Sequence, residues 1–193
     1  MAENKTADPN AETDEYGRAI HRYESMVLVV VPSAAYAEET LRYARSCLYN
    51  VHVGTRCVAR ESDELIRGRL QDEFLADEPL SQAKMADYSG VLFVGGEGAR
   101  ELADDPDALR LAREAQADGK LIGAWGDAVA VLARADVVKR RKVTGSPALA
   151  EELRRAGAKY TGSQVQRDGN VVTALDDAAG MRFGKALVAF VAI

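Results

Sequence analysis

The stretch of the sequence that most resembles an active site is LIGAWGDAVAVLA, residues 121–133. An apolar run ends there in Trp125, Gly126 and Asp127, and an alanine-rich segment with the character of a helix follows. In many α/β proteins the sharp turn between a central strand and its helix, the elbow, holds the nucleophile. Gly126 has no side chain, so the reactive group offered here is the Asp127 carboxylate. Asp127 could act as an acid or a nucleophile. Alternatively, Asp127 caps the following helix by accepting hydrogen bonds from the first backbone amides of that helix, and we prefer this interpretation.

Two further segments carry polar groups just after predicted strands, and they are expected at the same edge of the sheet. Glu38 could form a carboxylate pair with Asp127 for acid–base work. The structural alternative, which we prefer, is an acid in the first turn of a helix, where the helix dipole stabilises it. Gly95 and Gly96 could donate backbone N–H groups to an oxyanion, and they suit a tight turn in either case. Trp125 could stack on a ligand, but filling the pocket or packing in the core is preferred, because a large aromatic ring buries much area.

A serine–histidine mechanism is not predicted. Ser33 is the nearest hydroxyl at this edge, whereas His21 lies in the N-terminal segment and His52 is expected within the second strand. The GGEGAR segment lacks the lysine and the spacing of a phosphate-binding loop, so no nucleotide cofactor is expected.

No metal site is predicted, because no histidines and cysteines stand at ligand spacing. Glu38, Glu39 and Asp127 could hold a hard cation, but adjacent acids are also common at ordinary helix starts. Cys47 and Cys57 do not make a disulfide framework and are expected to be reduced thiols. A sensing role for either thiol would need exposure and electropositive surroundings.

The sequence alternates predicted strands with predicted helices, and these elements must position the groups above. Such alternation predicts right-handed βαβ units and an open, mainly parallel sheet with helices on both faces. Apolar, β-branched runs such as MVLVVV indicate strands buried on both faces. Asp168-Gly169 between two β runs predicts a hairpin over 163–173, and Asn50 is expected to stop a helix in the left-handed conformation. The other predicted strands are 26–31, 51–55, 90–94, 120–125 and 142–144, and the predicted helices are 38–49, 61–75, 106–119, 128–133, 147–156 and 183–191.

Composition and charge limit the class of protein. The chain has 193 residues, 47% of them hydrophobic and 28% charged, which is enough for one domain with a sizeable core. The net charge of −5 argues against a general nucleic-acid binder, and the basic cluster 139–142 is interpreted as a solvated loop. No apolar run approaches transmembrane length and no signal-peptide core is present, so we expect a cytoplasmic protein without membrane contact. We expect a flexible acidic tail over residues 1–22 and a single domain over residues 23–193.

Several segments, in this order and spacing, resemble the ThiJ/PfpI superfamily, which is part of the class I glutamine amidotransferase-like fold. VLFVGGEGARELADDP is similar to its strand–GG–helix segment, DGKLIGAWGDAVAVLA to its elbow segment, and KVTGSPALAEELRRAGAKY and RDGNVVTA to its downstream strand, helix and hairpin. The resemblance covers residues 26–193 and implies a flavodoxin-like three-layer sandwich. Because family members commonly dimerise, it also implies a homodimer or a higher homo-oligomer.

In active family members the elbow reads approximately Ala-Ile-Cys-His-Gly, where the cysteine is the nucleophile and a glutamate from the first strand–helix loop supports it. An ungapped alignment places Trp125 at the Ile position, Gly126 at the Cys position and Asp127 at the His position. The glutamate falls on Glu38, or on Glu39 if the loop shifts by one residue. The resemblance therefore implies a site that keeps the glutamate and lacks the thiol and the imidazole.

The form Ala-Trp-Gly-Asp after a VGGE turn also resembles the C-terminal flavodoxin-like domain of large-subunit catalases, which lacks the cysteine and is regarded as non-catalytic. We therefore expect a binding, assembly or stabilising role, without cofactor or metal, and a small-molecule ligand bound at Gly95, Gly96, Trp125 and Gly126. The alternative is an unconventional hydrolase or lyase that acts on a small carbonyl, nitrile-like or amide substrate through Glu38 and Asp127.

Overall fold

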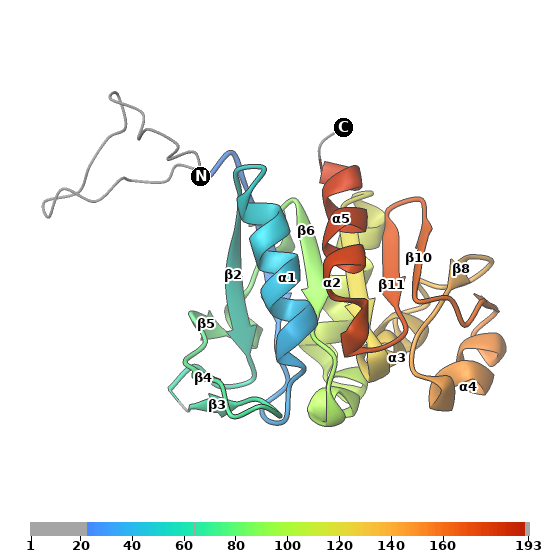
Figure 1. Ribbon diagram of the computed structural model, residues 1–193, viewed down its shortest axis with the longest axis horizontal. Helices are drawn as coiled ribbons and strands as arrows, with labels where there is room; N and C mark the ends of the chain where they lie inside the picture. Colours follow the sequence, from blue (N-terminus) through green and yellow to red (C-terminus); the bar gives the residue numbers. More distant parts are fainter. Residues whose placement is uncertain (1–22, 64, 192–193) are drawn as a thin grey trace, which may run out of the picture.

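The computed structural model of the protein describes residues 23–63 and 65–191 (Figure 1). The strands of its central sheet are β1 (Ser25–Val30), β2 (Val53–Ala59), β5 (Glu78–Pro79), β6 (Gly90–Phe93), β7 (Leu121–Trp125), β10 (Val165–Asp168) and β11 (Val171–Ala174). They form a seven-stranded sheet in the order β10-β11-β7-β6-β1-β2-β5. All neighbouring pairs are parallel except the β10–β11 hairpin, so the prediction of a mainly parallel sheet is confirmed.

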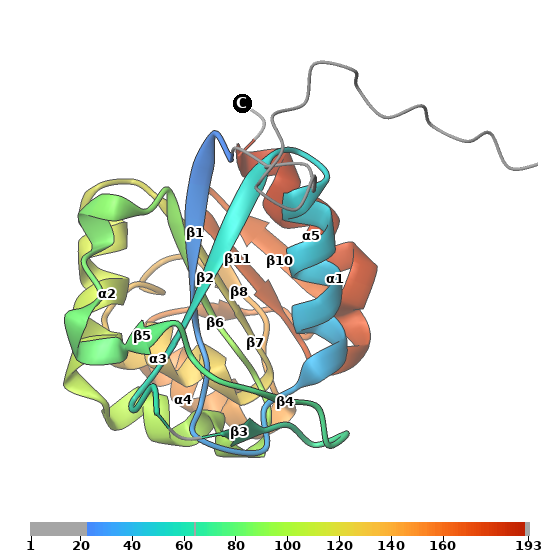
Figure 2. The same cartoon turned by 90° about the vertical axis from the view of Figure 1, so that its left-hand side faces the viewer.

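Helices cover both faces of the sheet, which makes the three-layer α/β sandwich of the flavodoxin-like class (Figure 2). Helices α1 (Glu38–Tyr49) and α5 (Gly180–Val191) lie side by side on one face. Helices α2 (Pro106–Ala117) and α3 (Val129–Arg134) lie on the other. No helix in residues 23–63 and 65–191 is both long and apolar enough to cross a membrane.

Two small sheets are attached to this sandwich. Strands β8 (Lys142–Val143) and β9 (Lys159–Tyr160) pair in parallel beside α4 (Ala150–Arg155), beyond the β10–β11 edge (Figure 1). Strands β3 (Ile66–Arg67) and β4 (Glu73–Phe74) form an antiparallel hairpin at the end of the sheet where α1 begins (Figure 2).

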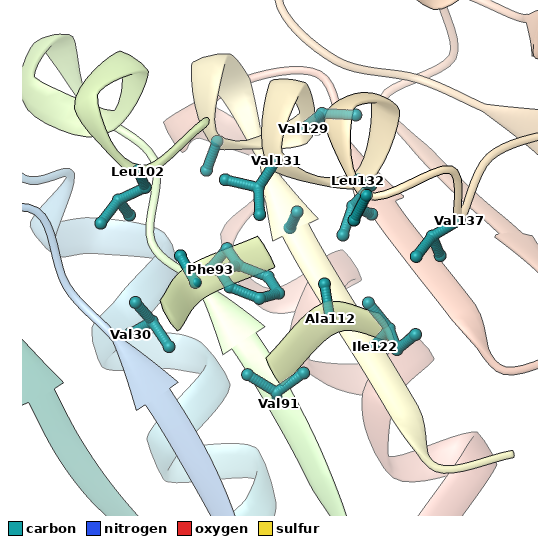
Figure 3. Close-up of a cluster of buried hydrophobic side chains, with 14 of the residues drawn as sticks. Val30, Val91, Phe93, Leu102, Ala112, Ile122, Val129, Val131, Leu132 and Val137 are labelled. Carbon is teal, nitrogen blue, oxygen red and sulfur yellow. The ribbon is translucent and has the colours of Figure 1, made fainter. Parts of the chain in front are cut away.

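Alternation along the buried strands divides the core between the two faces of the sheet. In β1, Leu28 and Val30 face α2 and α3, whereas Val27 and Val29 face α1 and α5, and all four are fully buried. Burial on both faces explains why this strand reads as a continuous apolar run. Figure 3 shows the cluster beneath α3, with Val30, Val91, Phe93, Leu102, Ala112, Ile122, Val129, Val131, Leu132 and Val137 labelled.

The helix predicted over residues 61–75 is wrong, because this segment forms the β3–β4 hairpin. Ile66 is buried and Phe74 packs edge-on against Tyr36 at 5.4 Å between ring centroids. The segment before α1 offers backbone partners to β3: Ala35 N–H donates to the Arg67 carbonyl (2.8 Å). A tertiary partner therefore decides the local structure of a charged segment whose composition alone favours a helix.

Two smaller predictions at the end of α1 are also wrong. Asn50 is right-handed (φ −64°), and the left-handed residue is His52 (φ 59°). His52 is exposed in the turn before β2 and does not belong to the strand. The predicted tail, with His21, lies outside the described residues, and the single domain over 23–193 stays a prediction.

Candidate functional site

The carboxyl ends of the central strands lie at the lower edge of the sheet in Figure 1. A pocket of about 190 Å³ opens beyond these strand ends. Ligands in open α/β sheets bind at such an edge. We call it the elbow pocket. It is lined by Ala37, Arg69, Gly96, Glu97, Trp125, Gly126, Asp127, Ser146, Pro147, Leu175, Asp176 and Asp177.

The elbow itself has the backbone geometry of a nucleophile-bearing turn without the nucleophile. Gly126 has φ 58°, the left-handed region that L side chains adopt only with strain. A Cβ built on Gly126 would meet no atom within 4 Å, so the position faces open space. The turn could therefore hold a side chain above the pocket, but the sequence provides none.

The double glycine after β6 is required by the close approach of two loops. Gly96 has φ 122°, and a Cβ there would collide with the Ala35 carbonyl oxygen. A Cβ on Gly95 would lie 2.5 Å from the Trp125 carbonyl oxygen. Ala37 N–H donates to the Gly95 carbonyl (2.8 Å), which ties the β1–α1 loop to this turn. Of the two glycines, Gly96 lines the elbow pocket.

Trp125 lies at the floor of the pocket and belongs to the core. Its residue is fully buried, and its ring packs against Phe183 of α5 with 5.4 Å between centroids. The indole Nε1 has no hydrogen-bond partner among the described residues. Since Trp125 points toward α5, it leaves the space above Gly126 open.

Glu38 lies next to the elbow pocket, but its side chain contacts the β3–β4 hairpin. Its side chain is buried, and one carboxylate oxygen, Oε1, accepts a hydrogen bond from the backbone amide of Leu70 in the β3–β4 hairpin. The other oxygen, Oε2, is buried without a partner in the described part of the chain. Glu38 lines a neighbouring hollow with Tyr36, Asp72 and Phe74. Glu38 and Asp127 therefore line different pockets.

Asp127 is partly buried at the rim of the elbow pocket and is not a helix cap. The N-cap residue of α3 is Ala128, and the structure shows no side-chain capping hydrogen bond at this helix within the described residues. The preferred interpretation of Asp127 as a cap is therefore wrong. The cause is a 3-10 turn over Gly126–Ala128, which precedes α3 and places Asp127 inside the turn rather than before the helix.

The sequence interpretation missed Arg69, Ser146, Asp176 and Asp177, which also line the pocket. Asp177 has a structural role, because its carboxylate accepts from the backbone amides of Thr40 (2.8 Å) and Glu39 (3.4 Å). It thus caps α1 from the other end of the chain, and it lies 3.4 Å from the Arg69 guanidinium. The two aspartates follow β11, so the rule that ligands meet strand ends could have found them. Arg69 was missed because residues 61–75 were predicted to form a helix.

Neither thiol is poised for reaction. Cys57 is buried and Cys47 is partly buried, and burial raises the pKa of both thiols. Both therefore favour the protonated, unreactive form at neutral pH. Within the described residues, no three histidine, cysteine, aspartate or glutamate side chains gather as a metal-ligand set.

Comparison with known proteins agrees with this architecture. The DJ-1/PfpI family model matches residues 26–190. An uncharacterized protein of Methanocaldococcus jannaschii is 29% identical over 161 residues, covering 82% of this chain and 78% of that protein. A ThiJ/PfpI domain protein from Brachyspira murdochii superposes with a TM-score of 0.82 at 23% identity, over 86% of this chain and 96% of that one.

A two-domain protein from Anabaena variabilis, with DJ-1/ThiJ/PfpI-like and ferritin-like domains, superposes with a TM-score of 0.81 at 20% identity. The match covers 86% of this chain and 48% of that longer protein. These structural similarities show the fold, and the match to the family model shows the family. With its parallel sheet, its glycine turn after β6 and its elbow after β7, this chain belongs to the DJ-1/PfpI family.

Proposed function

We propose that this chain is a DJ-1/PfpI-family protein without covalent chemistry, which binds a small polar molecule non-covalently in the elbow pocket. The observation that carries the proposal is the geometry at Gly126. Its backbone is left-handed and a side chain there would meet open space, but glycine supplies no nucleophile. A covalent mechanism needs a thiolate or a hydroxyl activated by a base. Ser146 brings a hydroxyl to the pocket, but no imidazole from residues 23–63 or 65–191 lines it.

The size and charge of the pocket narrow the class of ligand. About 190 Å³ is below the ~300–1,000 Å³ of sites for drug-sized molecules, so the ligand is small. Four carboxylates line the pocket, those of Glu97, Asp127, Asp176 and Asp177, against one guanidinium, that of Arg69. An excess of negative charge favours a ligand with an amine or several hydrogen-bond donors.

The alternative function, a hydrolase or lyase that uses Glu38 and Asp127, has less support. A carboxylate pair must converge on one reacting group to divide acid and base roles. Glu38 faces the hollow beside Asp72 and gives one oxygen to the Leu70 amide, whereas Asp127 faces the elbow pocket. We further propose a homodimer or a higher homo-oligomer, located in the cytoplasm, where Cys47 and Cys57 stay reduced.

Amide-resolved NMR tests the proposal. The ¹⁵N-labelled protein is titrated with small polar amines and with neutral and acidic molecules of matched size. We expect the amines to shift the amides of Gly96, Gly126 and Asp127. Asp127→Leu, which removes one of the carboxylates that line the pocket, should abolish these shifts. Asp118→Leu, on the exposed end of α2 and away from the pocket, is the control.

Two outcomes would overturn the proposal. One is the absence of pocket shifts with every class of molecule. The other is steady turnover of a carbonyl, nitrile or amide substrate that is lost in an Asp127→Ala variant with an unchanged unfolding midpoint. That second result would support the enzyme alternative, and Glu38→Gln would then show whether Glu38 takes part.

A further inference from the structure

We propose that the outer face of the β8–β9 sheet docks a short acidic segment of a partner protein. Arg140, Lys142 and Lys159 form the centre of this surface, Lys139 and Arg155 flank it, and we call it the basic face. The sheet lies beyond the β10–β11 edge in Figure 1, and none of these five residues lines the elbow pocket. The docking surface is therefore separate from the ligand site of the proposed function.

The charge of the chain is distributed unevenly. Residues 139–160, which contain β8, α4 and β9, carry seven basic and two acidic side chains. This segment therefore has a net charge of +5 within a chain of net charge −5, so the rest of the chain carries −10. An anionic partner is attracted to this one part of the surface and repelled by most of the remainder.

The nearby acidic residues do not neutralise the basic face. Glu151 and Glu152 each pair with an arginine outside the face, at 2.7 Å and 3.1 Å. Asp168 borders the face, and its carboxylate accepts a hydrogen bond from the backbone amide of Lys142 (2.8 Å). Among residues 23–63 and 65–191, no ion pair includes a side chain of the basic face. Its positive charge is therefore available to a partner.

Strand pairing places two lysines side by side at the centre of the face. Around β8, Arg141 is partly buried and Val143 is buried, whereas Lys142 between them is exposed, because side chains alternate along a strand. Lys159 of β9 is the register partner of Lys142 and is also exposed. Like charges directly opposite each other on neighbouring strands are destabilising. The fold therefore carries a repulsion here that a negatively charged partner would relieve.

The turn before β8 brings further basic residues to the face. The Arg140 amide donates to the Gly157 carbonyl (2.9 Å), and a Cβ built on Gly157 would lie 3.4 Å from Cγ of Lys139. Helix α4 ends at Arg155, just before Gly157. Lys139, Arg140 and Arg155 are all exposed. The basic cluster 139–142 thus meets residues of α4 and β9 that the sequence pattern alone does not connect to it.

Arg140 has an unfavourable backbone conformation. The Arg141 amide donates to the Val138 carbonyl (3.0 Å), so residues 138–141 form a turn whose third residue, Arg140, is left-handed (φ 66°). Glycine or asparagine is preferred at such a position, because a larger side chain there is strained. Arginine is not needed to make this turn. A strained arginine and an opposed lysine pair on one surface indicate that these basic side chains serve binding rather than folding.

A short acidic segment fits this face better than a long polyanion does. Nucleic-acid binding commonly rests on roughly 6–10 phosphate contacts, whereas the basic face has five cationic side chains. The remainder of the chain, with its charge of −10, repels a nucleic acid or an anionic membrane that extends past the face. A peptide with a few consecutive glutamates or aspartates matches the face in charge and ends where the face ends. Arginine and lysine bind such carboxylates through charge-assisted hydrogen bonds.

Fluorescence anisotropy of labelled octaglutamate, titrated with the full chain at low and at physiological ionic strength, tests the docking surface. We expect binding that weakens with salt. Lys142→Gln/Lys159→Gln should weaken binding roughly fivefold, because two of the five cations are removed. Arg182→Gln/Lys185→Gln removes the same charge from exposed positions of α5 and is the matched control, which should bind like the wild type.

The variant Arg140→Gly separates binding from folding. It relieves the left-handed strain and removes a cation. The thermal unfolding midpoint should therefore rise while the affinity for octaglutamate falls roughly threefold. A purely structural role for Arg140 would instead lower the midpoint, and that result would contradict the proposal.

Three further results would overturn the docking surface. They are no binding of octaglutamate at low ionic strength, a Lys142→Gln/Lys159→Gln variant that binds like the wild type, and equal weakening by the α5 control. Octathymidylate and vesicles of phosphatidylserine and phosphatidylcholine are the competing probes. Tighter binding of either would assign the face to a nucleic acid or a membrane and overturn the acidic protein partner.

Discussion

The backbone amide of Leu70 donates a hydrogen bond to the buried carboxylate of Glu38, so this glutamate, which the sequence resemblance predicts as an active-site acid, anchors the β3–β4 hairpin to the start of α1. A Cβ on Gly68 would collide with this carboxylate, which shows how closely the hairpin turn covers it. The position thus has a structural contact that needs no substrate. The hairpin in turn places Arg69 at the elbow pocket.

Replacing Glu38 should therefore change stability. Glu38→Ala leaves the Leu70 amide without an acceptor and opens a cavity, and we expect a loss of about 2–3 kcal/mol in the free energy of unfolding. Glu38→Gln keeps an acceptor for the amide and should lose less than half as much. Urea denaturation measures both values. Equal stability of Glu38→Ala and the wild type would show that the contact contributes nothing.

Three glycines with positive φ should respond differently to alanine. Gly126 and Gly119 have φ of 58° and 65°, and a Cβ on either meets nothing within 4 Å. Gly126→Ala and Gly119→Ala should each lose about 1–2 kcal/mol, the cost of a left-handed L residue. Gly96→Ala should lose clearly more, because its Cβ also collides with the Ala35 carbonyl. Thermal unfolding gives the order. If Gly126→Ala lost as much as Gly96→Ala, the space above the elbow would not be open.

The long-range cap on α1 should be measurable. Asp177→Ala removes the acceptor for the amides of Thr40 and Glu39, and we expect a loss of about 1–2 kcal/mol, typical of an N-cap. Asp118→Ala, which breaks only an exposed pair with Lys120, should change stability by less than about 0.5 kcal/mol. Chemical denaturation of both variants checks this. Equal effects would contradict the capping role.

Alkaline pH should destabilise the fold through two tyrosines. Burial, followed by the nearby Glu38 and Asp72 carboxylates, raises the pKa of Tyr36 from 10.0 to about 12. Burial and the hydrogen bond to Glu78 raise the pKa of Tyr88 likewise to about 12. Between pH 10 and 12 the unfolded chain releases these protons while the folded chain keeps them. Their stabilising contribution is therefore complete below pH 10 and is lost as the pH rises toward 12.

Urea denaturation at a series of alkaline pH values, with phenolate absorbance as a second readout, follows this loss. Tyr36→Phe and Tyr88→Phe should each weaken the dependence of stability on pH in this range, and the double variant should weaken it further. An unchanged slope in both single variants would contradict the raised pKa values.

Much of the fold could be predicted from the sequence, because its signals are local. The buried run at 26–31, the helix Glu38–Tyr49 and the Asp168-Gly169 hairpin carry periodicity or turn chemistry that survives in the structure. The helix predicted over 61–75 was wrong because tertiary packing outweighs helix propensity in this segment. Ile66 is buried and Phe74 packs against Tyr36, and these contacts stabilise the hairpin more than a helix would be stabilised.

The site was predicted less completely, because its contacts join distant segments. The elbow glycine and the double glycine were found from the order of strands and turns. The side chain that caps α1 belongs to Asp177, which is 137 residues away from Thr40 along the chain. Ala37, the N-cap residue, has no capping side chain, so the local sequence gives no sign of this cap. The contact between Glu38 and Leu70 likewise depends on a hairpin that the sequence pattern did not reveal.

The central claim is that the elbow keeps an open pocket above a position that has no nucleophile. The most direct test is alkylation of Gly126→Cys by iodoacetamide at neutral pH, followed by intact mass and peptide mapping. The wild type should stay unmodified on the same timescale, because burial raises the pKa of both native thiols. The account predicts an adduct at position 126 that forms before any at Cys47 or Cys57, because position 126 faces open space whereas Cys57 is buried and Cys47 is partly buried. A folded Gly126→Cys variant that reacts no faster than these two thiols would contradict it.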